Sequence, residues 1–379
     1  MSDEEESRSD APAGPSGEDD ASEQPARPWS SIPRWAVILA PIVGIIALLG
    51  SLIHVPYHAL GPGPSTNVLE RLKIRGAESF PSEGELLLTT ASVSDGPLSI
   101  WDAVWVWIDP KYDFIERRIL VPPGRTDEER RAQNLQQMEE SKIAAELAAF
   151  RALGHPVARL PGARVFTVIE GAPAEGKLRR GDQIVAIDGK RVTTRDAAIE
   201  AMRARRPGDA VRVRYIRDAR AHTVRIRTRA SASDATVPVI GVTLGTGYRF
   251  PNEVEIDTED IGGPSGGLIF ALSIVDALTE DDLTKGHIIA ATGEIVFKDD
   301  KPLVGPIGAV AEKIRSAHAA GARVFLVPDR DFEEACRVAD GNLRIIAVTT
   351  LNEAVDALRE LPPRGTSKTD TLEPGCSQK

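Results

Sequence analysis

Apolar and polar residues divide the chain into sections of different character. Residues 1–28 are rich in Asp, Glu, Ser, Pro and Ala and hold almost no large apolar side chain, which predicts a disordered segment. Residues 35–55 are nearly all apolar, and about 20 residues at a rise of about 1.5 Å span a bilayer core of roughly 30 Å. The pattern therefore predicts an acidic tail followed by one transmembrane helix.

A buried core helix and a cleaved signal peptide are the alternatives for this apolar segment. No other segment is as long and uncharged, and it lacks a clear small-x-small cleavage site, so a membrane helix is favoured. Arg27 and Arg34 precede the segment, whereas residues 54–67 contain neither Lys nor Arg. Because basic residues favour the cytoplasmic side, we expect a cytoplasmic N-terminus and an extracytoplasmic remainder.

Three elements are predicted between the membrane helix and residue 154. Residues 83–93 have the composition of a strand. Residues 100–108 contain three tryptophans, and their length and their alternation with Asp102 favour a buried strand over contact with the membrane surface. Residues 127–153 have helical spacing that ends at Gly154.

Two segments marked by glycine and proline carry the candidate chemistry. In the first, residues 261–268, Pro264 suits the entry to a helix and the glycines allow close backbone approach. Ser265 would then lie where free N–H groups of the helix terminus point outward, a position suited to a nucleophile and an oxyanion hole. Alone, such a turn is usually only a helix cap.

The second segment, residues 305–314, predicts a helix with Lys313 at the border of its apolar face. At about 100° per residue that face consists of Ile307, Val310, Ile314 and Ala317, with Glu312 and Arg315 on the other side. A half-buried lysine would have a depressed pKa and could accept the proton of a serine hydroxyl. The alternative is a lysine that extends to solvent.

With their flanks, these segments resemble the proteolytic domain of the Lon protease family, whose dyad pairs a serine in a Gly-Pro-Ser turn with a lysine on a later helix. The resemblance covers residues 254–361, including Thr-Gly-Glu-Ile at 292–295, and extends to residues 86–90 and 138–150. It implies Ser265 as the nucleophile, Lys313 as the base and Thr292 as the group that orients Lys313.

The resemblance also implies an oxyanion hole built from the turn backbone at Gly263, Pro264 and Gly266. A dry pocket for a neutral lysine would come from Ala291, Ile295 and Ile307. The chain departs from the family pattern at two positions, since Gly262 stands where many members have an acidic residue and Gly266 replaces the usual alanine.

Residues 165–189 resemble a PDZ domain of the bacterial protease type. The local pattern agrees, with turns at 181–182 and 188–189 around a core strand at 184–187, a helix at 194–203 and closing strands at 211–226. Such domains bind a peptide end by adding it as a strand. The Gly-Leu-Gly-Phe loop is absent, residues 154–160 are the nearest candidate, and a linker domain without a ligand is the alternative.

Together these patterns predict an α+β fold in which a Lon-type proteolytic domain carries an inserted β-rich PDZ domain and follows one transmembrane helix. The expected order is a disordered acidic cytoplasmic tail (1–34), the membrane helix (35–55), an extracytoplasmic segment with the first strands and helix of the protease fold (56–153), the PDZ domain (154–232), the proteolytic domain (235–362) and a disordered tail (363–379). This arrangement resembles membrane-anchored PDZ-Lon proteins of Gram-positive bacteria, and the high Ala, Arg and Gly content suits an actinobacterial source.

Composition excludes several other classes of protein. A formal charge of −10 over 379 residues argues against a nucleic-acid partner. Cys336 and Cys376 are far apart and predict neither a disulfide framework nor a metal site, and the six histidines show no metal-ligand spacing. No Gly-x-x-x-x-Gly-Lys-Ser/Thr segment occurs, so neither an ATPase module nor a cofactor is expected.

The sequence thus predicts an ATP-independent serine endopeptidase, anchored in the membrane, that cleaves unfolded or PDZ-delivered segments outside the cytoplasmic membrane. Its expected partners are the membrane, through one helix, and protein or peptide substrates, which the PDZ domain would bind by their C-terminal tails. By family resemblance the protein would form a homo-oligomer, a hexamer. The alternatives are a catalytically silent PDZ-based peptide-binding adaptor and an assembly factor at the membrane.

Overall fold

The computed structural model describes residues 34–120, 127–231, 234–259, 261–299, 301–339, 341–365 and 376. These residues divide between two compact units, of which the first ends at Leu52 and the second begins at Ile53. The predicted N-terminal tail lies outside the described residues, apart from Arg34.

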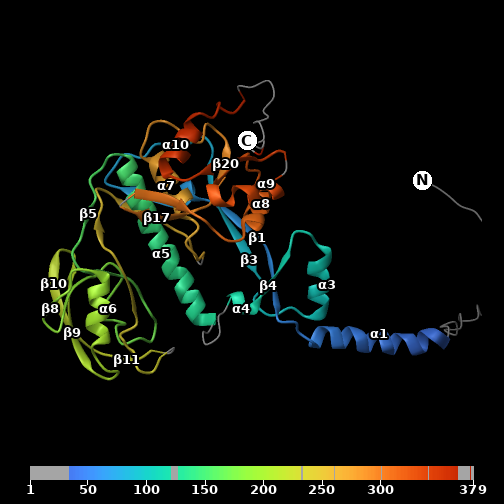
Figure 1. The fold of residues 1–379 in the computed structure, drawn as a ribbon, viewed down its shortest axis with the longest axis horizontal. Coiled ribbons are helices and arrows are strands. Elements are labelled where there is room, and N and C mark those ends of the chain that lie inside the picture. The colour runs from blue at the N-terminus through green and yellow to red at the C-terminus, as the bar shows by residue number, and fades with distance from the viewer. Residues whose placement is uncertain are drawn as a thin grey trace, which may run out of the picture. The chain divides into compact units, whose positions relative to one another are not determined.

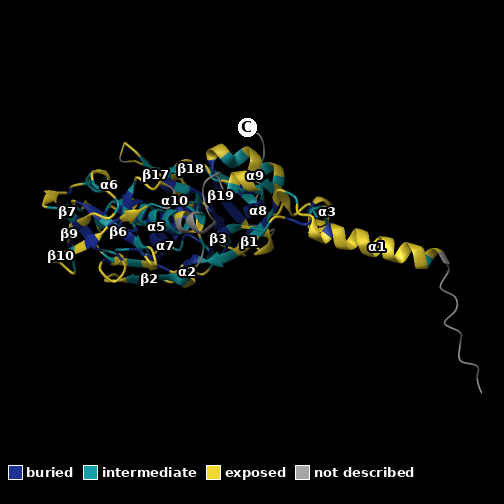
Figure 2. Cartoon of the chain, turned by 90° about the horizontal axis from the view of Figure 1, so that it is seen from below, coloured by how far each residue is buried: buried dark blue, intermediate teal, exposed yellow. Residues whose placement is uncertain are grey.

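The first unit consists of helix α1 (Arg34–Leu52). Its apolar residues are almost all exposed, and Figure 2 colours most of the helix accordingly. Residues Trp35–Leu52 are long and apolar enough to cross a membrane, by length and composition.

The second unit is built on a mixed sheet whose strands come from two distant parts of the chain (Figure 1). The strand order is β20 (Arg344–Val348), β19 (Val324–Pro328), β16 (Ile288–Ala291), β3 (Glu85–Val93), β1 (Tyr57–Asn67) and β4 (Asp113–Glu116). The first four strands are parallel, and β3, β1 and β4 are antiparallel neighbours. Ala291 pairs with Leu88, so the strand that leads to Thr292 lies directly beside the predicted strand at 83–93.

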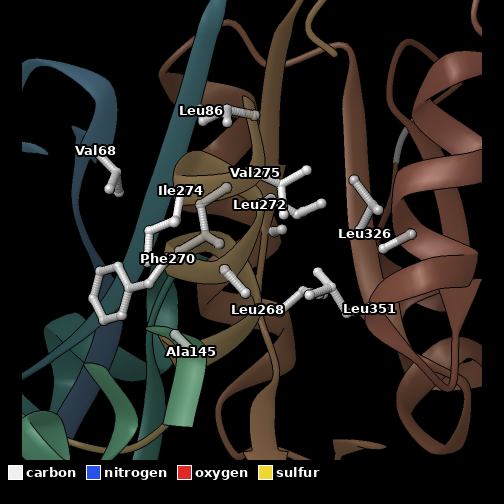
Figure 3. Close-up of a cluster of buried hydrophobic side chains, with 14 of the residues drawn as sticks. Val68, Leu86, Ala145, Leu268, Phe270, Leu272, Ile274, Val275, Leu326 and Leu351 are labelled. Carbon is white, nitrogen blue, oxygen red and sulfur yellow. The ribbon is translucent and has the colours of Figure 1, made fainter. Parts of the chain in front are cut away.

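Helices cover both faces of this sheet because successive side chains of its inner strands point to opposite sides. Leu86 and Leu88 contribute to one core, which surrounds the wholly buried helix α7 (Gly267–Ala277) and includes residues of α5 (Asp127–Ala152) and α10 (Leu351–Arg359). Figure 3 shows Phe270, Leu272 and Ile274 of α7 within that core. Leu87 contributes to the other core, beneath α8 (Val310–Ala319) and α9 (Phe332–Val338).

The part of the sequence between β4 and β16 contains a second sheet, which we call the β-rich unit together with helix α6 (Arg195–Arg203). Its strand order is β10 (Arg220–Arg227), β9 (Ala210–Arg217), β7 (Gln183–Ile187), β6 (Ala163–Val168) and β13 (Val242–Gly245), and β8 (Lys190–Arg191) pairs with β7. It has its own apolar core. Thr194 caps α6 through its side chain, which fits the predicted helix at 194–203. The sheet also includes β13, which lies after the boundary expected at residue 232.

Short elements complete the second unit. Two-stranded pairs join β11 (Arg229–Ala230) to β12 (Pro238–Val239), β14 (Tyr248–Arg249) to β5 (Ala158–Arg159), β15 (Glu253–Ile256) to β2 (Leu72–Arg75), and β17 (Glu294–Lys298) to β18 (Lys301–Gly305). The short helices are α2 (Val68–Arg71), α4 (Arg117–Leu120) and the 3-10 turn η1 (Asp329–Asp331).

The tryptophan segment was predicted wrongly. Residues Ile100–Ile108 form helix α3, which starts with a capping box between Ser99 and Asp102. Asp102 was interpreted as part of a strand alternation, but its carboxylate instead accepts from the Ser99 backbone N–H. Trp101, Trp105 and Trp107 are exposed rather than buried.

The cysteines also differ from the expectation, because Cys336 of α9 and Cys376 form a disulfide. The sequence did not indicate the pair, because Cys376 is 40 residues from Cys336 and lies in a polar part of the sequence. A disulfide that closes a loop of this length restricts the unfolded chain substantially. Disulfides persist mainly in oxidising compartments.

Replacing Cys376 with serine should lower the free energy of unfolding by about 4 kcal/mol, the loop-entropy estimate for a sequence separation of 40 residues. Denaturant titration of the wild type with and without a reductant, and of Cys376→Ser, measures this loss. Reduction should bring the wild type to the level of the variant and leave the variant unchanged. Two titratable thiols in the oxidised wild type would contradict the bond.

Candidate active site

Ser265 lies in a loop that the long helix α5 holds in place. The Gly263 N–H donates to the Asn134 carbonyl at 2.9 Å, and the Ser141 hydroxyl donates to the Pro264 carbonyl at 2.8 Å. Ser265 is half-buried and immediately precedes Gly266, the N-cap of α7. The contacts from α5 were not predicted, because nothing in the sequence near Asn134 or Ser141 marks them as partners of a distant turn.

The glycine at position 266 has a packing reason. A Cβ atom there would lie 2.7 Å from Cε2 of Phe270 and 3.1 Å from Cδ1 of Leu88. Contacts below about 3 Å require neighbouring groups to move, so the aromatic ring occupies the room that an alanine methyl would take. The position of Phe270 therefore explains why this chain has glycine where the family pattern has alanine.

Lys313 and Thr292 are brought to the Ser265 loop by neighbouring elements. Lys313 lies on α8, and its Nζ donates to Thr292 Oγ1 at 3.2 Å. Thr292 follows β16 directly, and its hydroxyl donates to the Ser265 carbonyl at 3.3 Å. The Gly293 N–H donates to the same carbonyl at 2.9 Å. The three residues singled out from the sequence therefore form one hydrogen-bonded chain.

Burial perturbs the lysine strongly. Only 5% of Lys313 is exposed, and burial lowers the pKa of its ammonium group from 10.5 to about 8, because desolvation disfavours the charged form. The negative charges of Asp331 and Glu312 oppose this shift. Asp331 was not predicted to lie near Lys313; it is the last residue of η1, directly before α9, and its carboxylate accepts from the Ile307 N–H.

The predicted orientation of helix α8 was partly wrong. Val310, Ile314 and Ala317 are buried as expected, but Glu312 is buried as well, and Ile307 lies before the helix begins at Val310. The reason is strand β1, which packs on the side of α8 expected to face solvent: Ser316 Oγ of α8 donates to the Gly63 carbonyl of β1 at 2.8 Å. Burial raises the pKa of the Glu312 carboxyl, and Asp113 adds to this effect.

The residues expected to make a dry pocket lie in separate places. Ala291 and Ile295 are buried in the core around α7, whereas Ile307 is half-buried and packs against the core beneath α8. Of the backbone groups expected to stabilise an oxyanion, Pro264 has no N–H and the Gly263 N–H already donates to Asn134. Of the three expected positions, Gly266 therefore keeps a backbone N–H for which no partner is described.

The β-rich unit offers an edge strand. Among the described residues β13 has a neighbour on one side only, β6, and lies at the end of its sheet. Gly241 precedes β13 with φ +75°, and a Cβ atom there would lie 2.1 Å from that of Ala172. The predicted loop at 154–160 lies elsewhere, since its strand β5 pairs with β14. The loop before β13 was not predicted as part of the PDZ domain, because it follows residue 232, the expected end of that domain.

A cleft of about 1110 Å³ lies between the β-rich unit and the Ser265 loop. It is lined by residues of β6, α5 and β15 and reaches Ile261, although neither Ser265 nor Lys313 lines it. Glu146 of α5 lies in the cleft, and burial raises the pKa of its carboxyl to about 8, while the nearby Arg164 opposes the shift. Within the described residues no group of His, Cys, Asp and Glu could hold a metal ion.

Two family models match the chain. A model of the PDZ domain matches residues 134–228, and a model of the Lon protease (S16) C-terminal proteolytic domain matches residues 259–360. The crystal structure of the PDZ domain of an SdrC-like protein from Listeria monocytogenes is 27% identical, with 23% of this chain and 90% of that chain covered and a TM-score of 0.21.

Curated relatives match the C-terminal part. Lon protease 2 of Myxococcus xanthus is 33% identical over 116 residues, which are 30% of this chain and 13% of that protein. Lon protease 2 of Bacillus subtilis is 31% identical over 147 residues, which are 36% of this chain and 25% of that protein. The chain thus spans a quarter or less of the length of these relatives. It combines a PDZ domain with a C-terminal proteolytic domain of the Lon protease family.

Proposed function

We propose that this protein is a membrane-anchored serine endopeptidase in which Ser265 is the nucleophile and Lys313 the general base. The buried Lys313 carries the proposal: its pKa is lowered to about 8, and its Nζ is two hydrogen bonds from the backbone carbonyl of Ser265. A neutral amine is the form that can accept a proton, and a pKa near the working pH suits a general base. Burial of the ammonium group costs free energy, and a lysine with a purely structural role would not need to be buried.

The reaction follows from these groups. Ser265 Oγ attacks the peptide carbonyl carbon while its proton passes to the neutral Nζ of Lys313, and the N–H groups of Ser265 and Gly266 stabilise the oxyanion. The C–N bond breaks as Lys313 returns the proton to the leaving amine, which leaves an ester on Ser265. Water, deprotonated by Lys313, then attacks that ester and regenerates the hydroxyl. Thr292 positions Lys313 throughout.

We infer that the reaction takes place outside the cytoplasmic membrane and without ATP. Helix α1, the basic residues that precede it and the Cys336–Cys376 disulfide support this location. Because no nucleotide-binding loop occurs in the sequence, the substrates would be segments that are already unfolded or exposed. Six copies around a ring, as the family resemblance implies, would enclose the active sites; the mass of the detergent-solubilised protein tests this assembly.

We further propose that the PDZ domain presents substrate tails at the edge strand β13. A peptide added there would continue the sheet of the β-rich unit beyond β6. The cleft between this unit and the Ser265 loop gives a bound chain a route toward Ile261. Removal of residues 154–232 alone would leave β13 without its partner β6, so a competitor is a better test than a deletion.

A free peptide that matches the C-terminal tail of a substrate should slow cleavage of that tail-bearing protein and leave cleavage of a short tail-less peptide unchanged. The same competitor with an amidated C-terminus should be weaker if backbone N–H groups hold a carboxylate. Initial rates with increasing competitor measure both effects. Equal inhibition of both substrates would point to competition at Ser265 and would count against delivery by the PDZ domain.

A further inference from the structure

The outer face of helix α3 is an exposed apolar surface. Trp101, Val104, Trp105 and Ile108 share this face at about 100° per residue, and Trp107 borders it. Trp105 is 65% exposed and Trp107 79%, while Val106, on the opposite side of the helix, is only 6% exposed. Val106 is the residue of α3 that is buried, whereas all three tryptophans of the helix are exposed.

The start of α3 is hydrogen-bonded to the residues that directly follow α1 in the chain. The Ile100 N–H donates to the Ile53 carbonyl at 3.1 Å, and the Val55 N–H donates to the Leu98 carbonyl at 2.8 Å. Ile53 is the residue after Leu52, the last residue of α1. Consecutive Cα atoms are about 3.8 Å apart, so α3 begins within a few residue lengths of the end of the apolar helix, whatever the orientation of either.

A second exposed apolar group is tied to the same short segment. The Arg117 N–H, at the start of α4, donates to the Pro56 carbonyl at 3.3 Å. Ile119 of α4 and Phe114 of the preceding strand β4 are exposed, and Phe114 packs edge-on against Tyr57 at a ring distance of 5.9 Å. Residues 53–57 are therefore hydrogen-bonded both to the start of α3 and to the start of α4.

We propose that α3 inserts its aromatic face into the headgroup region of the bilayer that α1 spans, with α4 contributing its exposed apolar side chain. This inference rests on the membrane anchor of the proposed function and goes beyond it. Tryptophan has an apolar ring system with one polar N–H, and it concentrates where hydrocarbon meets water. Helices with such a face lie in the plane of the interface rather than across the membrane. The contact would fix the catalytic unit close to the membrane surface instead of leaving it on a free tether.

Tryptophan emission in lipid nanodiscs tests the insertion with the full-length chain. The chain has five tryptophans, and replacing Trp29 and Trp35 with phenylalanine leaves those of α3 as the reporters. In discs of phosphatidylcholine and phosphatidylglycerol, bromine atoms near the glycerol backbone should quench the emission strongly. Bromine atoms near the bilayer centre should quench it less.

A matched control places the reporter on another exposed apolar position. In a chain without its five native tryptophans, Ile216→Trp on β9 of the β-rich unit should show no quenching by either lipid. If the α3 tryptophans are not quenched in discs that contain the protein, the insertion is wrong. It is also wrong if their emission changes only with the number of protein copies in a disc, because the helix then contacts a second copy and not the lipid. Failure of the protein to enter discs would instead overturn the membrane anchor.

Discussion

Replacing Ser265 with alanine should reduce kcat/KM for an unfolded protein substrate by about 10³-fold or more. Removal of the nucleophile leaves only binding and oxyanion stabilisation, which account for a small part of the rate enhancement in proteases that act through a serine. The fold should be unaffected, because the described contacts of the loop involve the Ser265 carbonyl and not its hydroxyl. Steady-state cleavage of unfolded casein in nucleotide-free buffer measures the loss.

Ser273 provides a matched control on α7, the helix that follows Ser265. Its hydroxyl is fully buried and donates to the Ile269 carbonyl one turn earlier at 2.8 Å, so Ser273→Ala removes a hydroxyl without breaking a contact between elements. We expect this variant to cleave casein at nearly the wild-type rate. If Ser265→Ala kept that rate as well, the catalytically silent adaptor would become the better account.

Replacing Lys313 with methionine should abolish cleavage to a similar extent while it preserves or raises stability. Methionine keeps most of the apolar length of the side chain, and it removes the cost of burying an ammonium group whose described hydrogen bond is to the Thr292 hydroxyl. The combination of lost activity and retained melting temperature would separate a base from a structural lysine. Lys301→Met, at an exposed position on β18, is the matched control and should leave both quantities unchanged.

The lowered pKa of Lys313 also fixes the direction of the pH dependence. With a pKa of about 8, roughly one tenth of the Lys313 side chains are neutral at pH 7, and roughly nine tenths at pH 9. Since the neutral form is the base, kcat/KM should rise with pH below about 8 and level off above it. A rate that falls across this interval would contradict the assignment of Lys313.

The local chemistry of the site was predictable because it depends on short segments. The glycines and Pro264 mark the entry to α7, and the spacing of apolar residues marks the helix of Lys313. What the sequence could not indicate is which distant segment covers each face. Glu312 was expected in solvent because its helix was considered alone, whereas β1 lies on that side of α8.

The two clearest errors in the fold have similar causes. The segment 100–108 has the composition of a buried strand, but the Ser99–Asp102 capping box starts a helix there and leaves the tryptophans outside. Cys376 lies in a polar tail, and only the folded position of α9 shows that Cys336 is its partner. Both errors come from interpreting side-chain type without knowing the surface on which it lies.

A double-mutant cycle on kcat/KM tests most directly whether Ser265 and Lys313 act as one catalytic unit. The cycle compares the wild type, Ser265→Ala, Lys313→Met and the double variant on unfolded casein without nucleotide. When two residues act in the same step, removing the second after the first costs little more. We predict that the double variant is no less active than either single variant. Losses that multiply in the double variant, or substantial activity in either single variant, would contradict the dyad.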